Sequence, residues 1–289
     1  MTFREQLAAL ESFSERQLRE YLYNVFALGL ILSPLTASRD QTVPDILSRV
    51  FRSASPPFQE RFRTSLAALL DNCSLSQENE AQESLALLLL TIGWTGAGYC
   101  RERLLWLANQ GILKGRVADR EDLHLRVLRI LVGCGIGSEG IALCARDLYD
   151  PWYAPICYRG LYEADLRNAE TYCVPLVQLH CRHPRIFFLD YQLRQMIAKV
   201  SLPLFAQWLH SIVGRLETDQ QEWLWRNLTG VIRYYQNPAD GIVYLSLDED
   251  LKNRVPCPDF PDEFLGYQIN ERSFEEPRTL ESLFEGPPS

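Results

Sequence analysis

The sequence predicts an all-α protein of about a dozen helices, followed by an acidic, mostly extended C-terminal tail. Three observations predict this fold class. Apolar residues recur at helical spacing, capping signals start one helix soon after another, and prolines and acids concentrate beyond residue 236. With 47% hydrophobic and 23% charged residues among 289, the composition is that of a globular protein. We therefore expect a helical-repeat domain at residues 1–236 and a tail at residues 237–289.

Local start signals mark the first helices. Ser14 and Gln17 form an S-x-x-Q capping box in front of apolar residues at helical spacing. Thr42 starts the next helix, with proline in its first turn, and the pair Pro56-Pro57 ends that helix and starts another. A further start at Ser76 leads into an apolar run. Helix is expected to follow helix, with short polar joints between them.

Two stretches, 85–111 and 125–148, match when the chain is shifted by 40 residues, which places Gly93 on Gly133. Each contains an apolar run of helix length, a glycine-containing turn and a shorter amphipathic run with arginines on its polar side. A period near 40 with two helices in each unit resembles HEAT and armadillo repeats. The resemblance implies a right-handed solenoid in which each unit buries the apolar face of its neighbour.

Residues 155–236 continue with apolar runs of helix length, the last of them behind an expected capping box at Thr218 to Gln221. Beyond residue 236 the pattern changes. The tail holds 12 acidic and 4 basic residues, which accounts for the net charge of −8, and 7 of the 16 prolines. Residues 241–247 are rich in β-formers and are expected to form a lone strand. Aromatic residues spaced among the acids favour an extended strap anchored on a groove, and a wholly disordered tail is the alternative.

Other features point to a cytoplasmic protein without a membrane span. The N-terminus lacks the basic-then-apolar order of a signal peptide, and no run approaches the roughly 18 apolar residues of a transmembrane helix. Eight cysteines at irregular spacing predict reduced thiols rather than a disulfide framework. Only 3 of the 29 basic residues are lysine. This excess of arginine favours protein or phosphate partners, and genomic base composition explains it equally well.

One glycine cluster supports a different function. Gly133, Gly135, Gly137 and Gly140 follow the sequence Arg-Ile-Leu-Val at residues 129–132, and this stretch resembles the first motif of class I methyltransferases and the dinucleotide-binding fingerprint. That resemblance implies an enzyme that binds S-adenosylmethionine or a nucleotide in a loop between a strand and a helix. It also requires an acidic residue at the end of a second strand about 20 residues later, where residues 154–160 contain none. We therefore favour a turn between two helices, and we expect no cofactor.

A possible metal site comprises Cys173, His180, Cys181 and His183, whose side chains are zinc ligands by type. Their spacing matches no C-x-x-C or H-E-x-x-H pattern, and Pro184 places His183 at a helix end. Buried thiols beside a histidine that caps a helix are the favoured interpretation.

The remaining candidates are aromatic residues suited to partner recognition, and no G-x-S-x-G or other catalytic motif accompanies them. Because Trp223 and Trp225 lie two apart on a helix, at least one ring should be partly exposed. Nucleic acid is an unfavoured partner, since residues 1–236 hold 25 acidic and 25 basic residues. We expect a non-catalytic adaptor, scaffold or regulatory subunit that binds a protein. The expected contact residues are Trp152, Tyr153, Trp223, Trp225, Phe260, Phe264 and Tyr267.

Overall fold

The computed structural model describes residues 2–28, 42–73, 75–76, 78–118, 121–184, 189–248 and 252–265. The chain divides into two compact units, Met1–Leu143 and Cys144–Ser289, which are described separately. The described part is predominantly α-helical, as predicted, but it also contains two small antiparallel sheets.

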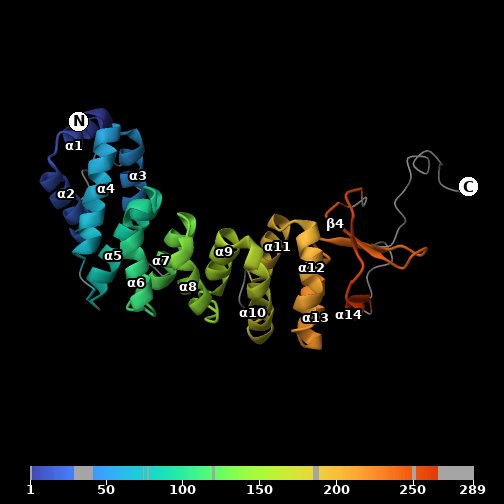
Figure 1. Cartoon of the computed structure of the whole chain (residues 1–289). Coiled ribbons are helices and arrows are strands. Elements are labelled where there is room, and N and C mark those ends of the chain that lie inside the picture. Colours follow the sequence, from blue (N-terminus) through green and yellow to red (C-terminus); the bar gives the residue numbers. More distant parts are fainter. Residues whose placement is uncertain are drawn as a thin grey trace, which may run out of the picture. The chain divides into compact units, whose positions relative to one another are not determined.

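The first unit is built from helices that pack against helices nearby in the sequence (Figure 1). Helix α2 packs against α4 and α5, while α3 packs against α5 and α5 packs against α7. A two-residue ladder between β1 and β2 precedes α7. The elements are α1 (Phe3–Glu11), α2 (Glu15–Leu28), α3 (Val43–Ser53), α4 (Pro56–Asp71), α5 (Asn79–Trp94), the 3₁₀ helix η2 (Ala97–Cys100), α6 (Arg101–Gln110), β1 (Val117–Ala118), β2 (Glu121–Asp122) and α7 (Leu123–Gly133), followed by the start of α8 (Gly137–Asp147).

The capped starts predicted at Ser14 and Thr42 are present, whereas the start expected at Ser76 is wrong, because α5 begins at Asn79 with Glu78 as its N-cap. The backbone N–H of Ser14 donates to the side-chain oxygen of Gln17 at 2.9 Å, and the N–H of Gln17 donates back to the hydroxyl of Ser14. Thr42 forms a second capping box with Asp45. These reciprocal bonds satisfy backbone donors that a helix start leaves without intrahelical partners.

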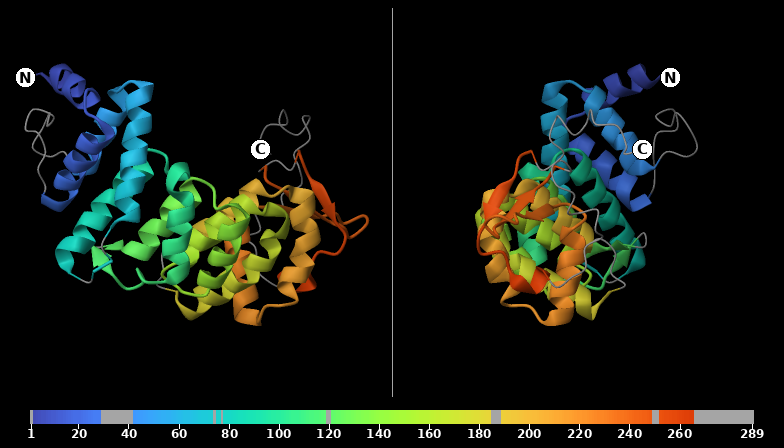
Figure 2. Two further views of the ribbon diagram at one scale, coloured as in Figure 1. Left: turned by 60° about the vertical axis from the view of Figure 1, so that its left-hand side comes forward. Right: turned by 90° about the vertical axis from the view of Figure 1, so that its right-hand side faces the viewer.

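The second unit continues with antiparallel helices (Figures 1 and 2). Helices α9, α11 and α13 pack in series, and α10 packs against α12 as well as against α9, α11 and α13. The helices are α9 (Ala154–Ala164), the 3₁₀ helix η3 (Leu166–Asn168), α10 (Ala169–Arg182), α11 (Leu189–Lys199), α12 (Leu202–Val213) and α13 (Thr218–Leu228).

The joint between α12 and α13 differs by one residue from the prediction. The capping box uses Glu217 and Gln220, so the expected box at Thr218 and Gln221 is wrong. Gln221 instead donates its side-chain amide to two carbonyls at the end of α12, those of residues 213 and 216, at 3.4 and 3.0 Å. This contact fixes the start of α13 against the end of the preceding helix.

The same joint occurs between α3 and α4 in the first unit. The side-chain amide of Gln59 donates to the carbonyls of Phe51 and Ala54 at 3.0 and 3.1 Å. In both joints the glutamine follows its helix N-cap by four residues, and it bonds to carbonyls eight and five residues before it. The two units therefore share a way of joining consecutive helices.

Residues beyond 228 form a three-stranded sheet in the order β3, β4, β5, with all pairs antiparallel. The strands are β3 (Arg233–Gln236), β4 (Val243–Ser246) and β5 (Val255–Cys257). The strand that was expected to be alone, at residues 241–247, contains β4, which pairs with both of the others. Strands β4 and β5 pack against α12. The sheet thus joins residues on both sides of position 236, and the predicted tail contributes two of its three strands.

A short helix, α14 (Asp262–Leu265), packs against α13. The ring of Phe264 is fully buried and stacks on Trp225 with centroids 4.7 Å apart. The ring of Phe260 meets the same indole edge-on, with centroids 5.8 Å apart. It also packs against the ring of Tyr234, with centroids 5.2 Å apart. These aromatic contacts bind the segment 257–265 to the last long helix. The rest of the predicted strap, residues 266–289, lies outside the described residues.

Candidate protein-interaction site

The glycine cluster spans a turn between two helices: Gly133 ends α7, Gly135 lies in the turn, and Gly137 and Gly140 belong to the first turn of α8. Residues 129–132, which the cofactor interpretation requires as a strand, belong to α7, and α8 begins at Gly137. Gly135 and Gly137 have φ angles of +86° and +56°, a conformation that favours glycine. The guanidinium of Arg101 donates to the carbonyl of Ile136 at 2.6 Å. It lies so close to Gly137 that a Cβ there would be 1.7 Å from the Arg101 Nη2 atom.

The four residues of the possible metal site are not brought together. Cys173 is fully buried, and burial raises the pKa of its thiol to about 12. The ring of His180 packs against that of Trp223 with centroids 4.3 Å apart and planes tilted by 32°, and burial lowers the pKa of its imidazole, although Asp190 opposes this effect. His183 is the exposed C-cap of α10. Neither these residues nor others in the described ranges form a group of three or more His, Cys, Asp or Glu side chains suited to a metal ion.

Arginines bind the helices of the first unit to one another. The almost completely buried side chain of Arg126 pairs with Glu121 at 2.8 Å and donates to the carbonyl of Ala86 at 3.1 Å. Arg129 pairs with the same Glu121 carboxylate. Arg103 stacks over Trp106, with its Cζ atom 4.2 Å from the ring centroid. Together with Arg101, these arginines are therefore engaged in contacts within the protein. They also give the arginine excess a structural use, since guanidinium groups stack and donate several bonds at once.

Most of the aromatic residues expected to contact a partner lie in the core. Tyr153, Trp225, Phe260 and Phe264 are buried, at 5%, 4%, 7% and 0% exposure. Trp223 is half-buried against His180, which agrees with the expectation that one ring of the Trp223 and Trp225 pair is partly exposed. Tyr267 lies outside the described residues. Trp152 is 79% exposed, the highest value among the large hydrophobic side chains of the described chain.

A second exposed aromatic residue, Tyr149, was not predicted. Its side chain is 69% exposed and lies three residues before Trp152. Both belong to the connection between α8 and α9, residues 147–154, which we call the aromatic turn. The signal that could have revealed Tyr149 is its place beside the turn-forming pair Asp150-Pro151.

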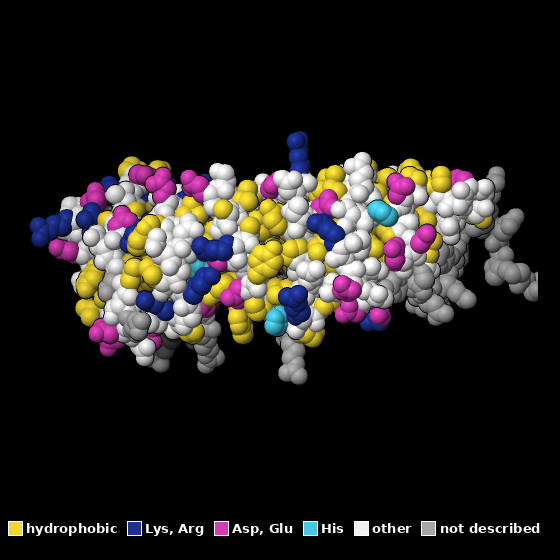
Figure 3. Space-filling view, turned by 60° about the horizontal axis from the view of Figure 1, so that its bottom comes forward, with side chains coloured by type: hydrophobic (Ala, Val, Ile, Leu, Met, Phe, Trp, Pro, Cys, Tyr) yellow, Lys and Arg dark blue, Asp and Glu magenta, His cyan; other side chains and the backbone are white. Residues whose placement is uncertain are grey.

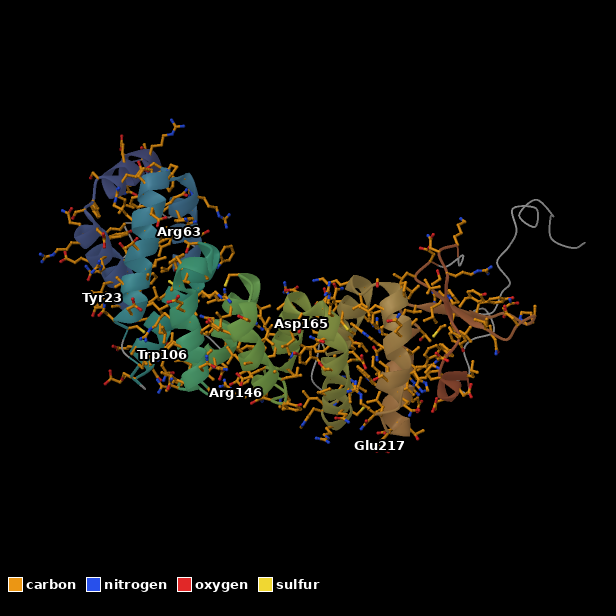
Figure 4. All side chains as sticks on the ribbon, in the orientation of Figure 1. Tyr23, Arg63, Trp106, Arg146, Asp165 and Glu217 are labelled. Atoms are coloured by element: carbon orange, nitrogen blue, oxygen red, sulfur yellow. The ribbon has the colours of Figure 1, made fainter. Side chains whose placement is uncertain are left out.

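The two ends of the aromatic turn are buried. The carboxylate of Asp147 is 1% exposed and accepts from the Arg146 guanidinium at 2.9 and 3.3 Å. Figure 4 shows Arg146 at the end of α8, where the turn begins. At the other end, Tyr153 and Ala154 are buried. The turn is therefore attached to the core on both sides.

Hydrogen bonds also fix the middle of the turn. The Asp150 carboxylate accepts from the N–H of Trp152 at 3.0 Å, and its backbone carbonyl accepts from the N–H of Ala154 at 2.8 Å. Such bonds from an aspartate to the backbone two residues later are typical of ordered turns. Figure 3 turns the lower helix ends of Figure 1 toward the viewer and shows hydrophobic side chains at the surface between charged ones. A rigid turn thus presents two aromatic rings to solvent.

No helix in the described ranges has the length and apolar character needed to cross a membrane. No family model, curated protein or solved structure matches this chain.

Proposed function

We propose that the chain is a HEAT-like helical-repeat protein that serves as a non-catalytic interaction module, such as an adaptor, a scaffold or a regulatory subunit. The observation that carries this proposal is the serial packing of helices two apart in sequence. It occurs as α3, α5 and α7 in the first unit and as α9, α11 and α13 in the second. Stacked helix pairs bury their apolar faces against their neighbours in this way and leave extended surfaces for partners.

The recurring joint supports the same proposal. Gln59 and Gln221 make equivalent bonds to the preceding helix, although 162 residues separate them. A joint repeated with the same spacing is expected where one supersecondary unit recurs along a chain.

The alternative, an enzyme that binds S-adenosylmethionine or a nucleotide at Gly133 to Gly140, gains no support. A helix precedes the glycines, and the Arg101 side chain covers the side of Gly137 that a ligand would approach. A dinucleotide site needs a strand before the loop and space for a phosphate beside its glycines.

The test is affinity purification of the tagged full-length protein from its native cell, followed by binding measurements with the purified partner. We expect a stoichiometric protein partner and no heat of binding when S-adenosylmethionine is titrated into the protein. Saturable binding of S-adenosylmethionine, with no protein partner, would reverse the choice between the two functions.

The acidic C-terminus is proposed to modulate partner binding. A protein that ends at Leu265 lacks only residues 266–289, so it retains the sheet and α14. Its affinity for the partner should differ from that of the full-length protein. Equal affinities would exclude a modulatory role for residues 266–289.

A further inference from the structure

We propose that the aromatic turn anchors the module on its partner, and that this partner is a protein with an uncharged, apolar pocket that receives the Trp152 indole. This inference rests on the proposed function and specifies where the partner binds. Trp and Tyr are, with Arg, the residue types most enriched at the energetic centres of protein interfaces. Trp152 and Tyr149 are also the two most exposed large hydrophobic side chains of the described chain, at 79% and 69%.

The rigidity of the turn separates it from an incidental exposed side chain. Leu148 and Tyr153 are 2% and 5% exposed, and they fix the backbone directly beside the two projecting rings. Asp150 ties the middle of the turn to the backbone of residues 152 and 154. The backbone therefore needs little ordering when a partner binds, and this lowers the entropic cost of association.

The hydrogen-bonding groups of the two rings indicate what the pocket must contain. No hydrogen bond engages either ring within the part of the chain that the structure describes. The indole N–H can only donate, and the phenol can donate or accept. Because a buried indole N–H normally finds a partner, the pocket should present a carbonyl or a similar acceptor.

The charges near the turn favour a neutral pocket. Arg146 is held by the buried carboxylate of Asp147, and Asp150 accepts from the N–H of Trp152. Residues 144–236 as a whole contain 10 basic and 9 acidic residues. Nucleic acids and anionic membranes attract proteins through an excess of basic charge, which this segment lacks. Binding at the aromatic turn should accordingly depend weakly on salt.

Site-specific photo-cross-linking tests the location. A benzophenone amino acid replaces Trp152 in the full-length protein, which is irradiated in the native cell. The matched control carries the same group at Tyr191, another aromatic residue of this unit, with 52% exposure. We expect one protein to be cross-linked from position 152 and not from position 191.

Affinity measurements with that purified protein test the energetics. Trp152→Ala should raise Kd by at least about 30-fold, the loss typical of a hot-spot residue, whereas Tyr191→Ala should leave Kd nearly unchanged. Kd for the unmodified protein should vary little between about 50 and 300 mM salt. Circular dichroism and the melting temperature of Trp152→Ala should match those of the unmodified protein, because the substituted side chain lies at the surface.

Each contrary result has a separate meaning. If the full-length protein binds its partner and Trp152→Ala binds it equally well, the anchor is overturned and the proposed function stands. If the full-length protein captures no partner, both fail. Cross-linking to a second copy of this chain overturns the inference in favour of self-association. Binding to phosphatidylcholine vesicles that Trp152→Ala abolishes, with no protein cross-linked, overturns it in favour of a membrane surface.

Discussion

Phe264 closes the C-terminal segment of the second unit onto α13, and its removal tests whether that segment belongs to the core. The side chain is fully buried, stacks on Trp225 at 4.7 Å and lies 6.0 Å from Phe260 between ring centroids. Replacing a buried phenylalanine by alanine costs about 3–5 kcal/mol, since apolar contact is lost and a cavity remains. Phe264→Ala should lower the free energy of unfolding of this unit by that amount. For a domain of this size the melting temperature should fall by roughly 10 °C.

Differential scanning calorimetry and urea unfolding of the full-length protein measure this change. Leu265→Ala is the matched control, because the neighbouring side chain is 40% exposed and should contribute less than about 1 kcal/mol. A Phe264→Ala change no larger than that of Leu265→Ala would refute the assignment of residues 257–265 to the core. A protein truncated after Leu265 should keep its melting temperature. One truncated after Gln236 should unfold at a lower temperature, because it exposes Trp225 and the face of α12.

Three further predictions concern the turn, the buried charges and pH. Gly137→Ala should lower the free energy of unfolding by about 1–3 kcal/mol, because its φ of +56° strains an alanine and Arg101 must move. The control Gly98→Ala, whose added Cβ meets no atom within 4 Å, should change it little, and equal effects in chemical unfolding would contradict this account. Glu121→Gln should lower the free energy of unfolding by about 2–3 kcal/mol, because it leaves the buried Arg126 without its counter-ion. The control Glu20→Gln removes only a surface pair with Arg16 and should lower it by under about 1 kcal/mol. A small loss for Glu121→Gln in urea unfolding would count against the buried pair. Burial lowers the pKa of His180 in the folded protein, so the contribution of His180 to stability is complete above the ordinary histidine pKa near 6.5 and is lost as pH falls below it. His180→Gln should flatten this decline in stability between about pH 7 and 5, and an unchanged slope would exclude His180 as the source of the decline.

The helix starts at Ser14 and Thr42 were predictable because capping is local chemistry. Ser14 with Gln17 and Thr42 with Asp45 satisfy backbone donors within one turn, so a short window of sequence contains the whole signal. At the start of α13, two adjacent positions offer a suitable side chain. Contact between Gln221 and the end of α12 selects Glu217 as the cap, and that contact is invisible in a local window.

The three-stranded sheet was beyond local reasoning for a related reason. Its strands have only three or four residues, and β5 is separated from β4 by a segment rich in charge. The alternation that reveals a strand is too short to specify partners, even though the paired residues, such as Gln236 with Val243, are close in the sequence. The β-rich stretch near Val243 could be recognised, but its position between two partners could not.

Burial of the aromatic residues was predictable only in part. The spacing of Trp223 and Trp225 implies that their rings face different directions, and the structure agrees. Which ring is covered depends on the segment that contains Phe260 and Phe264, about 40 residues further along the chain. Aromatic residues among acids therefore resembled partner contacts although they complete the core. Trp152 differs because its turn is ordered by its own backbone and by Asp150, so no distant segment is needed to place the ring.

The glycine fingerprint illustrates how the same local geometry serves different purposes. Gly135 and Gly137 adopt positive φ angles, as sharp turns often require, whether or not the turn binds a phosphate. A cofactor loop leaves the space beside its glycines open for the ligand. In this protein the Arg101 guanidinium occupies the space beside Gly137 and donates to the carbonyl of Ile136. Because Gly137 has no side chain, the Arg101 guanidinium of α6 fits beside it, and the turn contributes to the packing of α6 with the helices that follow it.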